Sequence, residues 1–212
     1  MKYKGIIFDL DGVICSTDEY HYQAWKELAD SIDVYFDREI NNRLRGVSRM
    51  ESLEIILEKS GVNYSEEEKL EMAEKKNGIY KVLLGRMNTA DLTNEVKSTL
   101  DGLRAAGLKL AIGSSSKNAK FILERIGLKD YFDAISDGTN ISKSKPDPEV
   151  FLKAAEYLGL EPQECLVVED AKAGIDAAVA GAFESAGLGE AASYDKATYP
   201  MDSFSALLDI AL

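Results

Sequence analysis

The chain is poor in cysteine and has no long apolar run. Its 212 residues include two cysteines, four prolines and one histidine. Cys15 and Cys165 form no CxxC pair and lack metal-ligand spacing; a disulfide between them stays open, but a reduced cytosolic chain is favoured. No apolar run approaches the ~18 residues that cross a bilayer. Because Asp9 and Asp11 interrupt the N-terminal apolar stretch too early for a signal peptide, we expect a cytoplasmic protein without a membrane partner.

Positive charge is also scarce. Lysine and arginine number 25 against 37 aspartates and glutamates, which gives a net charge of −12. Because nucleic acids and anionic membranes attract cationic surfaces, we expect neither as the main partner. A hydrophobic fraction of 45% is ordinary for a soluble globular protein. The length fits one domain with a large insertion or two small domains, and the sequence shows no exposed apolar stripe, which predicts a monomer.

Short apolar segments alternate with amphipathic segments over most of the chain. Buried strands are predicted at residues 5–10, 108–112, 132–135, 165–168 and 182–186. Helices are predicted at residues 96–106, 116–126, 148–158 and 171–180. Each helix is followed by a glycine in the position of a left-handed helix cap: Gly107, Gly127, Gly159 and Gly181. This alternation predicts an α/β fold, a Rossmann-like parallel sheet with helices on both faces.

The stretch from about residue 17 to residue 87 has a different pattern. Only helical periodicity occurs there, at residues 19–29, 40–44, 50–59 and 66–84. A stretch of roughly 70 residues without a strand predicts a helical subdomain inserted after the first strand. We therefore expect a core domain of residues 1–16 plus 89–212 and a helical cap of residues 17–88. Two crossings would join the cap to the core, which permits a hinge.

Acidic residues follow two of the predicted strands. Asp9 and Asp11 end the first strand, and Glu169 and Asp170 follow the strand at 165–168. If these strands are neighbours, the carboxylates gather at the sheet edge where ligands bind. Two carboxylates 4 Å apart repel by about 4 kcal/mol at an effective dielectric near 20, so such a group needs a cation. Oxygen ligands suit Mg²⁺, although capping by these aspartates is the alternative interpretation.

Two further segments are suited to phosphate. The run Ser114-Ser115-Ser116-Lys117-Asn118 lies between a strand and a helix, where hydroxyl and backbone N–H groups can donate to phosphate oxygens. A simple serine N-cap is an equal alternative. Lys145 precedes Pro146, which favours an extended backbone that can aim the lysine side chain from a fixed loop. A solvated loop lysine is the alternative, but beside carboxylates Lys145 would neutralise an aspartate and a phosphate.

Taken in order, these segments resemble the haloacid dehalogenase superfamily of phosphotransferases, and the insertion is similar to the superfamily's cap at that position. Within the superfamily, the chain most resembles the β-phosphoglucomutase family. The matching segments are residues 8–14, 19–21, 24–25, 44–49, 52–53, 76–77, 80, 114, 116–118, 131–135, 144–146 and 169–170. The resemblance covers essentially the whole chain, whereas the tail after Gly181 matches the family pattern poorly.

The resemblance implies a role for each residue around the aspartates. Asp9 is the nucleophile that forms an aspartyl phosphate, and Asp11 is the general acid and base. Ser114 and Lys145 contact the transferring phosphoryl group. The implied Mg²⁺ ligands are Asp9, Asp11 through its backbone carbonyl, Glu169 and Asp170.

The resemblance also implies residues that bind the substrate. Arg49 in the cap would bind the distal phosphate of a sugar bisphosphate, together with Ser116, Lys117 and Asn118 from the core. Without the resemblance, a solvated charge on a helix is the favoured interpretation of Arg49. His21 would link cap closure to Asp11, although a lone histidine on a helix is more often structural. The other implied substrate-binding residues are Trp25, Gly46, Val47, Ser48, Ser52, Lys76 and Ser115.

The activity implied is the interconversion of β-D-glucose 1-phosphate and glucose 6-phosphate, with β-glucose 1,6-bisphosphate as primer and intermediate. A phosphatase for small sugar phosphates on the same scaffold is the main alternative, since the core motifs do not separate the two. A dehalogenase or phosphonate hydrolase is disfavoured because those relatives lack an acid at the position of Asp11. A regulatory phospho-acceptor domain is disfavoured because it needs no inserted cap.

Overall fold

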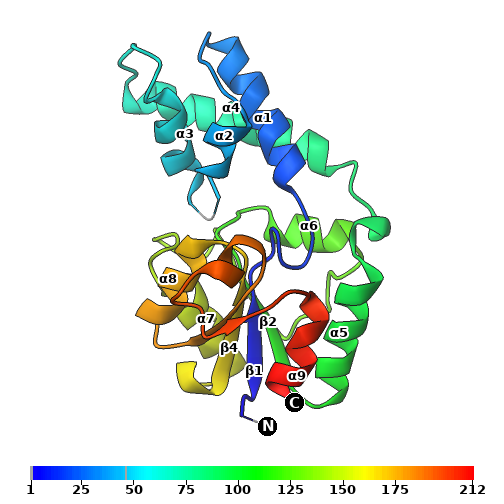
Figure 1. Ribbon diagram of the computed structural model, residues 1–212. Coiled ribbons are helices and arrows are strands. Elements are labelled where there is room, and N and C mark those ends of the chain that lie inside the picture. The colour runs from blue at the N-terminus through cyan, green and yellow to red at the C-terminus, as the bar shows by residue number, and fades with distance from the viewer. Residues whose placement is uncertain (1, 46) are drawn as a thin grey trace.

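The computed structural model describes residues 2–45 and 47–212, and within these residues six strands form one parallel sheet in the order β3-β2-β1-β4-β5-β6 (Figure 1). The strands are β1 (Gly5–Phe8), β2 (Lys109–Gly113), β3 (Ala134–Ser136), β4 (Cys165–Glu169), β5 (Glu184–Gly187) and β6 (Tyr199–Pro200). All pairings are parallel, so the carboxyl ends of the strands lie at one edge of the sheet. The predicted α/β class with a parallel sheet is confirmed.

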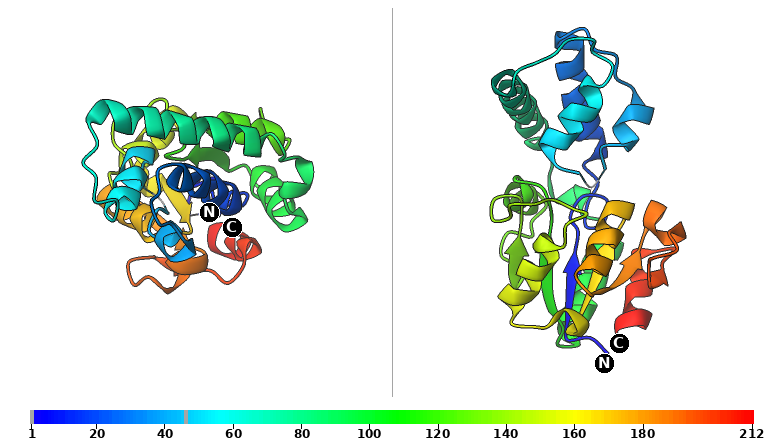
Figure 2. Two further views of the ribbon diagram at one scale, coloured as in Figure 1. Left: turned by 90° about the horizontal axis from the view of Figure 1, so that it is seen from above. Right: turned by 90° about the vertical axis from the view of Figure 1, so that its left-hand side faces the viewer.

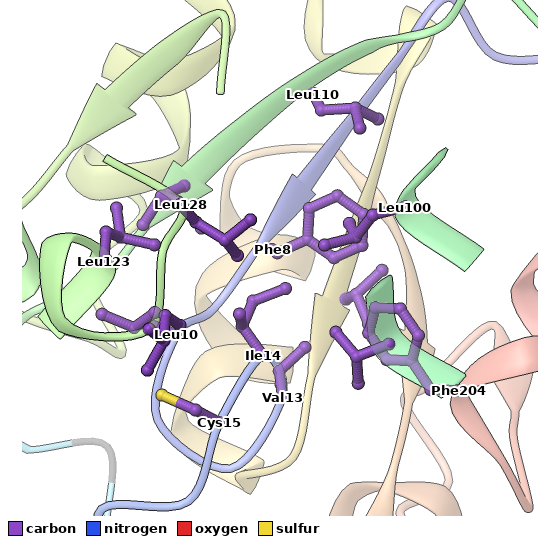
Figure 3. Packing of buried hydrophobic residues seen from close by; sticks show 14 of the residues in the cluster. Phe8, Leu10, Val13, Ile14, Cys15, Leu100, Leu110, Leu123, Leu128 and Phe204 are labelled. Atoms are coloured by element: carbon purple, nitrogen blue, oxygen red, sulfur yellow. The ribbon is translucent and has the colours of Figure 1, made fainter. Parts of the chain in front are cut away.

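Helices cover both faces of the sheet. They are α5 (Asn94–Ala105), α6 (Ala119–Arg125), α7 (Glu149–Leu158), α8 (Lys172–Ala180) and α9 (Leu207–Ala211). Alternate residues of each strand point to opposite faces. Phe8 and Leu110 therefore pack with side chains of α5, α6 and α9, as Figure 3 shows around Leu100 and Leu123. Ile7 and Val167 pack against α7 and α8 on the other face.

Four helices lie beyond the carboxyl ends of the strands (Figure 2). They are α1 (Asp18–Ser31), α2 (Arg38–Asn42), α3 (Arg49–Leu57) and α4 (Glu66–Leu84). Trp25, Leu28, Leu53 and Ile56 belong to a hydrophobic cluster separate from the two sheet clusters. The helical nature of this segment is as expected, and the boundaries of the cap at residues 17 and 88 stay a prediction. Short 3₁₀ turns complete the chain at Thr89–Asp91, Pro162–Glu164, Gly189–Ser193 and Phe204–Ala206.

The prediction for Gly181 is wrong. Gly107, Gly127 and Gly159 have positive φ, as expected for left-handed caps, but Gly181 has φ −85° and Ala182 takes the positive φ of 60° instead. A Cβ on Gly181 would lie 2.7 Å from the Phe183 ring. The glycine at this position therefore makes room for that ring and does not supply a left-handed turn.

Two other sequence predictions differ from the structure in detail. The helix predicted from residue 116 begins at Ala119, so Ser116, Lys117 and Asn118 lie in the preceding loop. The sequence did not predict β6 or α9, which are short elements in the tail. Cys15 and Cys165 are both buried and free, as favoured. The described helices include none that is both long and apolar enough to span a bilayer.

Candidate active site

The carboxyl ends of β1, β2 and β4 meet beneath the cap helices. Phe8 is in register with Ile112 on one side and Val168 on the other, which brings the residues that follow these strands together. A cavity of 700 Å³ opens there. The predicted site residues that line it are Asp9, Asp11, His21, Trp25, Val47, Ser48, Arg49, Ser52, Lys76, Ser114, Ser115, Ser116, Lys117, Asn118, Lys145, Glu169 and Asp170. Gly46, also predicted, lies outside the described residues.

Lys145 lies at the centre of the acidic end of the cavity. Its Nζ is 2.6 Å from Asp9 Oδ1 and also donates to the Glu169 carboxylate. The side chain is 2% exposed, and its Nζ lies 4.7 Å from the centre of the Phe151 ring. Burial alone would lower the pKa of Lys145, but the charges of Asp9 and Glu169 outweigh it and raise that pKa. Lys145 is therefore a permanent cation between two carboxylates.

Backbone groups fix the position of Glu169. The N–H groups of Asp170 and Ala171 each donate to Glu169 Oε2 at 2.9 Å. Gly174, the third residue of α8, leaves room for this carboxylate, because a Cβ there would lie 1.9 Å from the Glu169 carboxyl carbon. Burial raises the pKa of Glu169, while the nearby Lys145 opposes that shift. The start of α8 thus holds a buried acid at the cavity.

Asp9, Glu169 and Asp170 form a group suited to a divalent cation. One carboxylate oxygen from each lies within 4.8 Å of the other two. Partial burial, followed by the charges of Glu169 and Asp9, raises the pKa of Asp170 to about 8. Such a carboxyl becomes stable as an anion when a cation is added, and an all-oxygen donor set suits Mg²⁺. Gly12, with φ 87°, gives Asp170 its space, because a Cβ on Gly12 would lie 2.1 Å from Asp170 Oδ2.

Asp11 lines the same cavity but is not one of these three clustered carboxylates. Its Oδ1 accepts a hydrogen bond from the Thr17 hydroxyl. Desolvation in the cleft, reinforced by the negative charge of Asp9, raises the pKa of Asp11 to about 7. A carboxyl with that pKa can both accept and donate a proton near neutral pH, which is the requirement for a general acid and base. Ligation of a metal by the Asp11 backbone carbonyl stays a prediction.

Lys76 lies on the cap side of the cavity. It is buried between aromatic rings, with its Nζ 4.6 Å from the Trp25 ring centre and 4.4 Å from that of Tyr80. Burial lowers the pKa of Lys76 to about 7. Its Nζ is also 2.9 Å from His21 Nδ1, and burial lowers the pKa of His21 well below its usual value. When Lys76 is protonated, its ammonium donates this hydrogen bond and Nδ1 of the neutral imidazole accepts it.

Arg49 begins α3 in the cap and lines the same cavity as Lys145. Its guanidinium forms an ion pair with Glu74 at 2.8 Å and donates to Asn77 Oδ1 at 3.0 Å. Asn118 of the core donates to the same oxygen at 3.1 Å, which joins cap and core directly. Arg49 from the cap and Lys117 and Asn118 from the core all line the cavity, so donors from both sides face it.

A model of the haloacid dehalogenase-like hydrolase family matches residues 3–181. The chain belongs to this family. The matched region contains β1 to β4, with the acids, the serine and the lysine that converge on the cavity. The family membership implies a divalent metal at the carboxylate group, and the geometry of Asp9, Glu169 and Asp170 fits one.

Several family members resemble the chain closely. It is 44% identical over 189 residues to the beta-phosphoglucomutase of Bacillus subtilis, a match that covers 88% of this chain and 84% of that protein. The phosphorylated carbohydrates phosphatase of Thermotoga maritima is 30% identical over 184 residues, covering 85% of this chain and 82% of that protein. The crystal structure of the beta-phosphoglucomutase from Clostridium difficile superposes with a TM-score of 0.91 at 40% identity, covering 97% of this chain and 93% of that one.

Sequence reasoning missed four residues with clear contacts at this family site. Thr17 donates to Asp11, Glu74 pairs with Arg49, Asn77 joins Arg49 to Asn118, and Gly174 makes room for Glu169. Asn77 matched the β-phosphoglucomutase family pattern, but no role was predicted for it. Thr17 and Glu74 gave no local signal, since a threonine before a helix and a glutamate on one are common. The roles of Thr17 and Glu74 depend on side-chain contacts, with Asp11 and Arg49, that only the folded chain brings together.

Proposed function

We propose that the protein is a β-phosphoglucomutase, which interconverts β-D-glucose 1-phosphate and glucose 6-phosphate. One observation carries the proposal: the cavity is lined by two groups of phosphate-binding donors, one that includes the partner of Asp9 and one joined through Asn77. The first group is Lys145, which contacts Asp9, and Ser114, which follows the neighbouring strand; the second is Arg49 with Lys117 and Asn118. A bisphosphate can thus place either phosphate at Asp9. The relatives from Bacillus subtilis and Clostridium difficile support this assignment.

Asp9 is the proposed carrier of the phosphoryl group. In the first half-reaction, Asp11 accepts the proton of a sugar hydroxyl while that oxygen attacks the phosphorus of the Asp9 phosphate. The Asp9 O–P bond breaks, the sugar O–P bond forms, and the product is the bisphosphate. After the bisphosphate turns round, Asp9 attacks the other phosphorus, and Asp11 returns the proton to the leaving oxygen. The pKa of about 7 for Asp11 suits both directions.

The other groups neutralise charge and hold the reactants in line. Lys145 pairs with Asp9 and offsets the charge on the transferring group. We propose that Asp9, Glu169 and Asp170 hold Mg²⁺, which supplies positive charge beside the phosphoryl group when bound. The cap encloses the sugar, which limits attack by water. We also propose that the protein acts in the cytoplasm as a monomer on small sugar phosphates, without nucleic acid or membrane partners.

A phosphatase acting on small sugar phosphates is the second candidate, supported by the similarity to the Thermotoga maritima enzyme. The test is NMR of β-glucose 1-phosphate with Mg²⁺ and a trace of β-glucose 1,6-bisphosphate, beside the α anomer. A mutase yields glucose 6-phosphate and little inorganic phosphate. Release of phosphate at the rate of isomerisation would favour the phosphatase. Arg49→Ala separates the two further, because it cripples a mutase but spares a phosphatase without a distal phosphate.

A further inference from the structure

Asn77 links the two sides of the cavity through one oxygen atom. It lies on α4 in the cap, and its side chain is buried. Arg49 of the cap donates to Asn77 Oδ1 at 3.0 Å, and Asn118, which precedes α6 in the core, donates to the same atom at 3.1 Å. A guanidinium has only donors, so the amide of Asn77 must present its oxygen to Arg49. Asn118 must then present its NH₂ group.

The far end of α4 is also fixed to α6. Arg125, the last residue of α6, donates from Nε to the Met87 carbonyl and from Nη2 to the Gly85 carbonyl, each at 2.9 Å. Gly85 directly follows α4. The start and the end of α6 therefore contact α4 and its exit at separate points. The Arg125 contacts lie beside the predicted join between cap and core.

The spacing of these contacts makes the bond at Asn77 sensitive to cap movement. Asn77 precedes Gly85 by eight residues, which is about 12 Å along a helix. A rotation of the cap by about 10° around the Arg125 contacts would move Asn77 by about 2 Å. A hydrogen bond of 3.1 Å does not survive that displacement. Opening of the cap therefore breaks the bond between Asn77 and Asn118, while the Arg125 contacts remain.

We infer that Asn77 is a positioning residue that latches the cap to the core and aligns Arg49 with Asn118 for the distal phosphate. The inference rests on the proposed function for the identity of that phosphate. With the latch formed, one oxygen orients a charged donor of the cap and an amide donor of the core. Without it, each donor must be ordered when the substrate binds, which weakens binding.

The test compares Asn77→Leu, which keeps the branched side-chain skeleton but removes the acceptor, with Asn63→Leu, an exposed position between α3 and α4. Solution X-ray scattering of the substrate-free proteins reports the opening of the cap without depending on any substrate. We expect a larger radius of gyration than that of the wild type for Asn77→Leu, and an unchanged radius of gyration for Asn63→Leu. Steady-state kinetics with β-glucose 1-phosphate should show kcat/KM lower by about 10- to 100-fold for Asn77→Leu, mainly through KM.

A double-mutant cycle separates a latch from a general role in folding. If Asn77 acts through Asn118, the combined Asn77→Leu/Asn118→Ala variant loses much less than the product of the single losses. Multiplicative losses, or unchanged scattering, would overturn the inference. If Asn77→Leu does not fold, Asn77→Asp tests it instead, since its carboxylate accepts both bonds and should keep the compact scattering profile. Should the wild type fail to isomerise glucose phosphates, the proposed function fails, and the scattering comparison still decides on the latch.

Discussion

Replacing Lys145 by methionine should destabilise the protein strongly in the absence of metal. The substitution leaves the carboxylates of Asp9 and Glu169 buried without their shared cation. At an effective dielectric near 20, two unit charges 2.6 Å apart attract by about 6 kcal/mol, an upper limit because desolvation of the ammonium offsets part of it. Removing one partner of a buried ion pair costs about 3–5 kcal/mol. We expect a loss in that range at pH 7.5.

The destabilisation should depend on pH. Burial raises the pKa of Glu169, and Lys145 opposes that shift. Without Lys145 this pKa rises further above that of the unfolded chain, so the folded state binds the proton more tightly. The resulting stabilisation is present below the unfolded pKa, near 4, and is lost as pH rises through the folded value. The deficit of the variant is therefore small at pH 4.5 and large at pH 7.5. Added Mg²⁺ should recover part of it by binding only the folded state.

Urea denaturation followed by circular dichroism measures this difference. Lys153→Met is the matched control, because Lys153 forms a partly exposed pair with Glu149 at 2.9 Å within α7. Its loss should be far smaller than that of Lys145→Met, because water screens an ion pair at the surface. A loss for Lys145→Met as small as that of the control, or the same at both pH values, would refute the assignment of Lys145 as the counter-ion of the two acids.

The remaining predictions concern the metal and the proton. Gly174→Ala should weaken Mg²⁺ binding at least tenfold in a calorimetric titration, because its Cβ displaces Glu169; unchanged affinity would show that Glu169 is not a ligand. Binding of Mg²⁺ at pH 7 should release a proton, since the metal lowers the pKa of about 8 at Asp170; a pH-indicator dye would detect it, and no release would contradict the shared site. Asp11→Asn should lower kcat by roughly 10²- to 10⁴-fold and remove the inflection near pH 7 from the wild-type profile; a profile that keeps this inflection would assign the proton transfer elsewhere.

The sequence predicts best what depends on local order along the chain. Asp9 and Glu169 each stand at the end of an apolar strand, and parallel pairing of β1 with β4 then brings them together. Ser114 comes directly after β2, the other neighbour of β1, so parallel pairing brings it to the same edge of the sheet. Each of these residues could therefore be assigned to the site from its place after a strand. Lys145 needed the family resemblance as well, since a loop lysine has no fixed direction.

The sequence predicts poorly what depends on distant contacts. Gly181 follows a helix as a cap glycine does, yet the Phe183 ring, and not a left-handed turn, explains it. Gly174 looks like an ordinary helical residue until Glu169 is placed against it. β6 was missed because it is two residues long and contains Pro200, which is unfavourable in the interior of a sheet. Such features depend on tertiary packing, which the hydrophobic periodicity of the sequence does not reveal.

The central claim is that Asp9 carries the phosphoryl group. Incubation with β-glucose 1,6-bisphosphate and Mg²⁺, followed by rapid quenching and borohydride reduction, converts an aspartyl phosphate to homoserine that peptide mass spectrometry can locate. The account predicts homoserine at position 9, none in a sample without bisphosphate, and none in Asp9→Asn. Reduction at Asp11 or Asp170 with Asp9 intact, or phosphate found on Ser114, would contradict it.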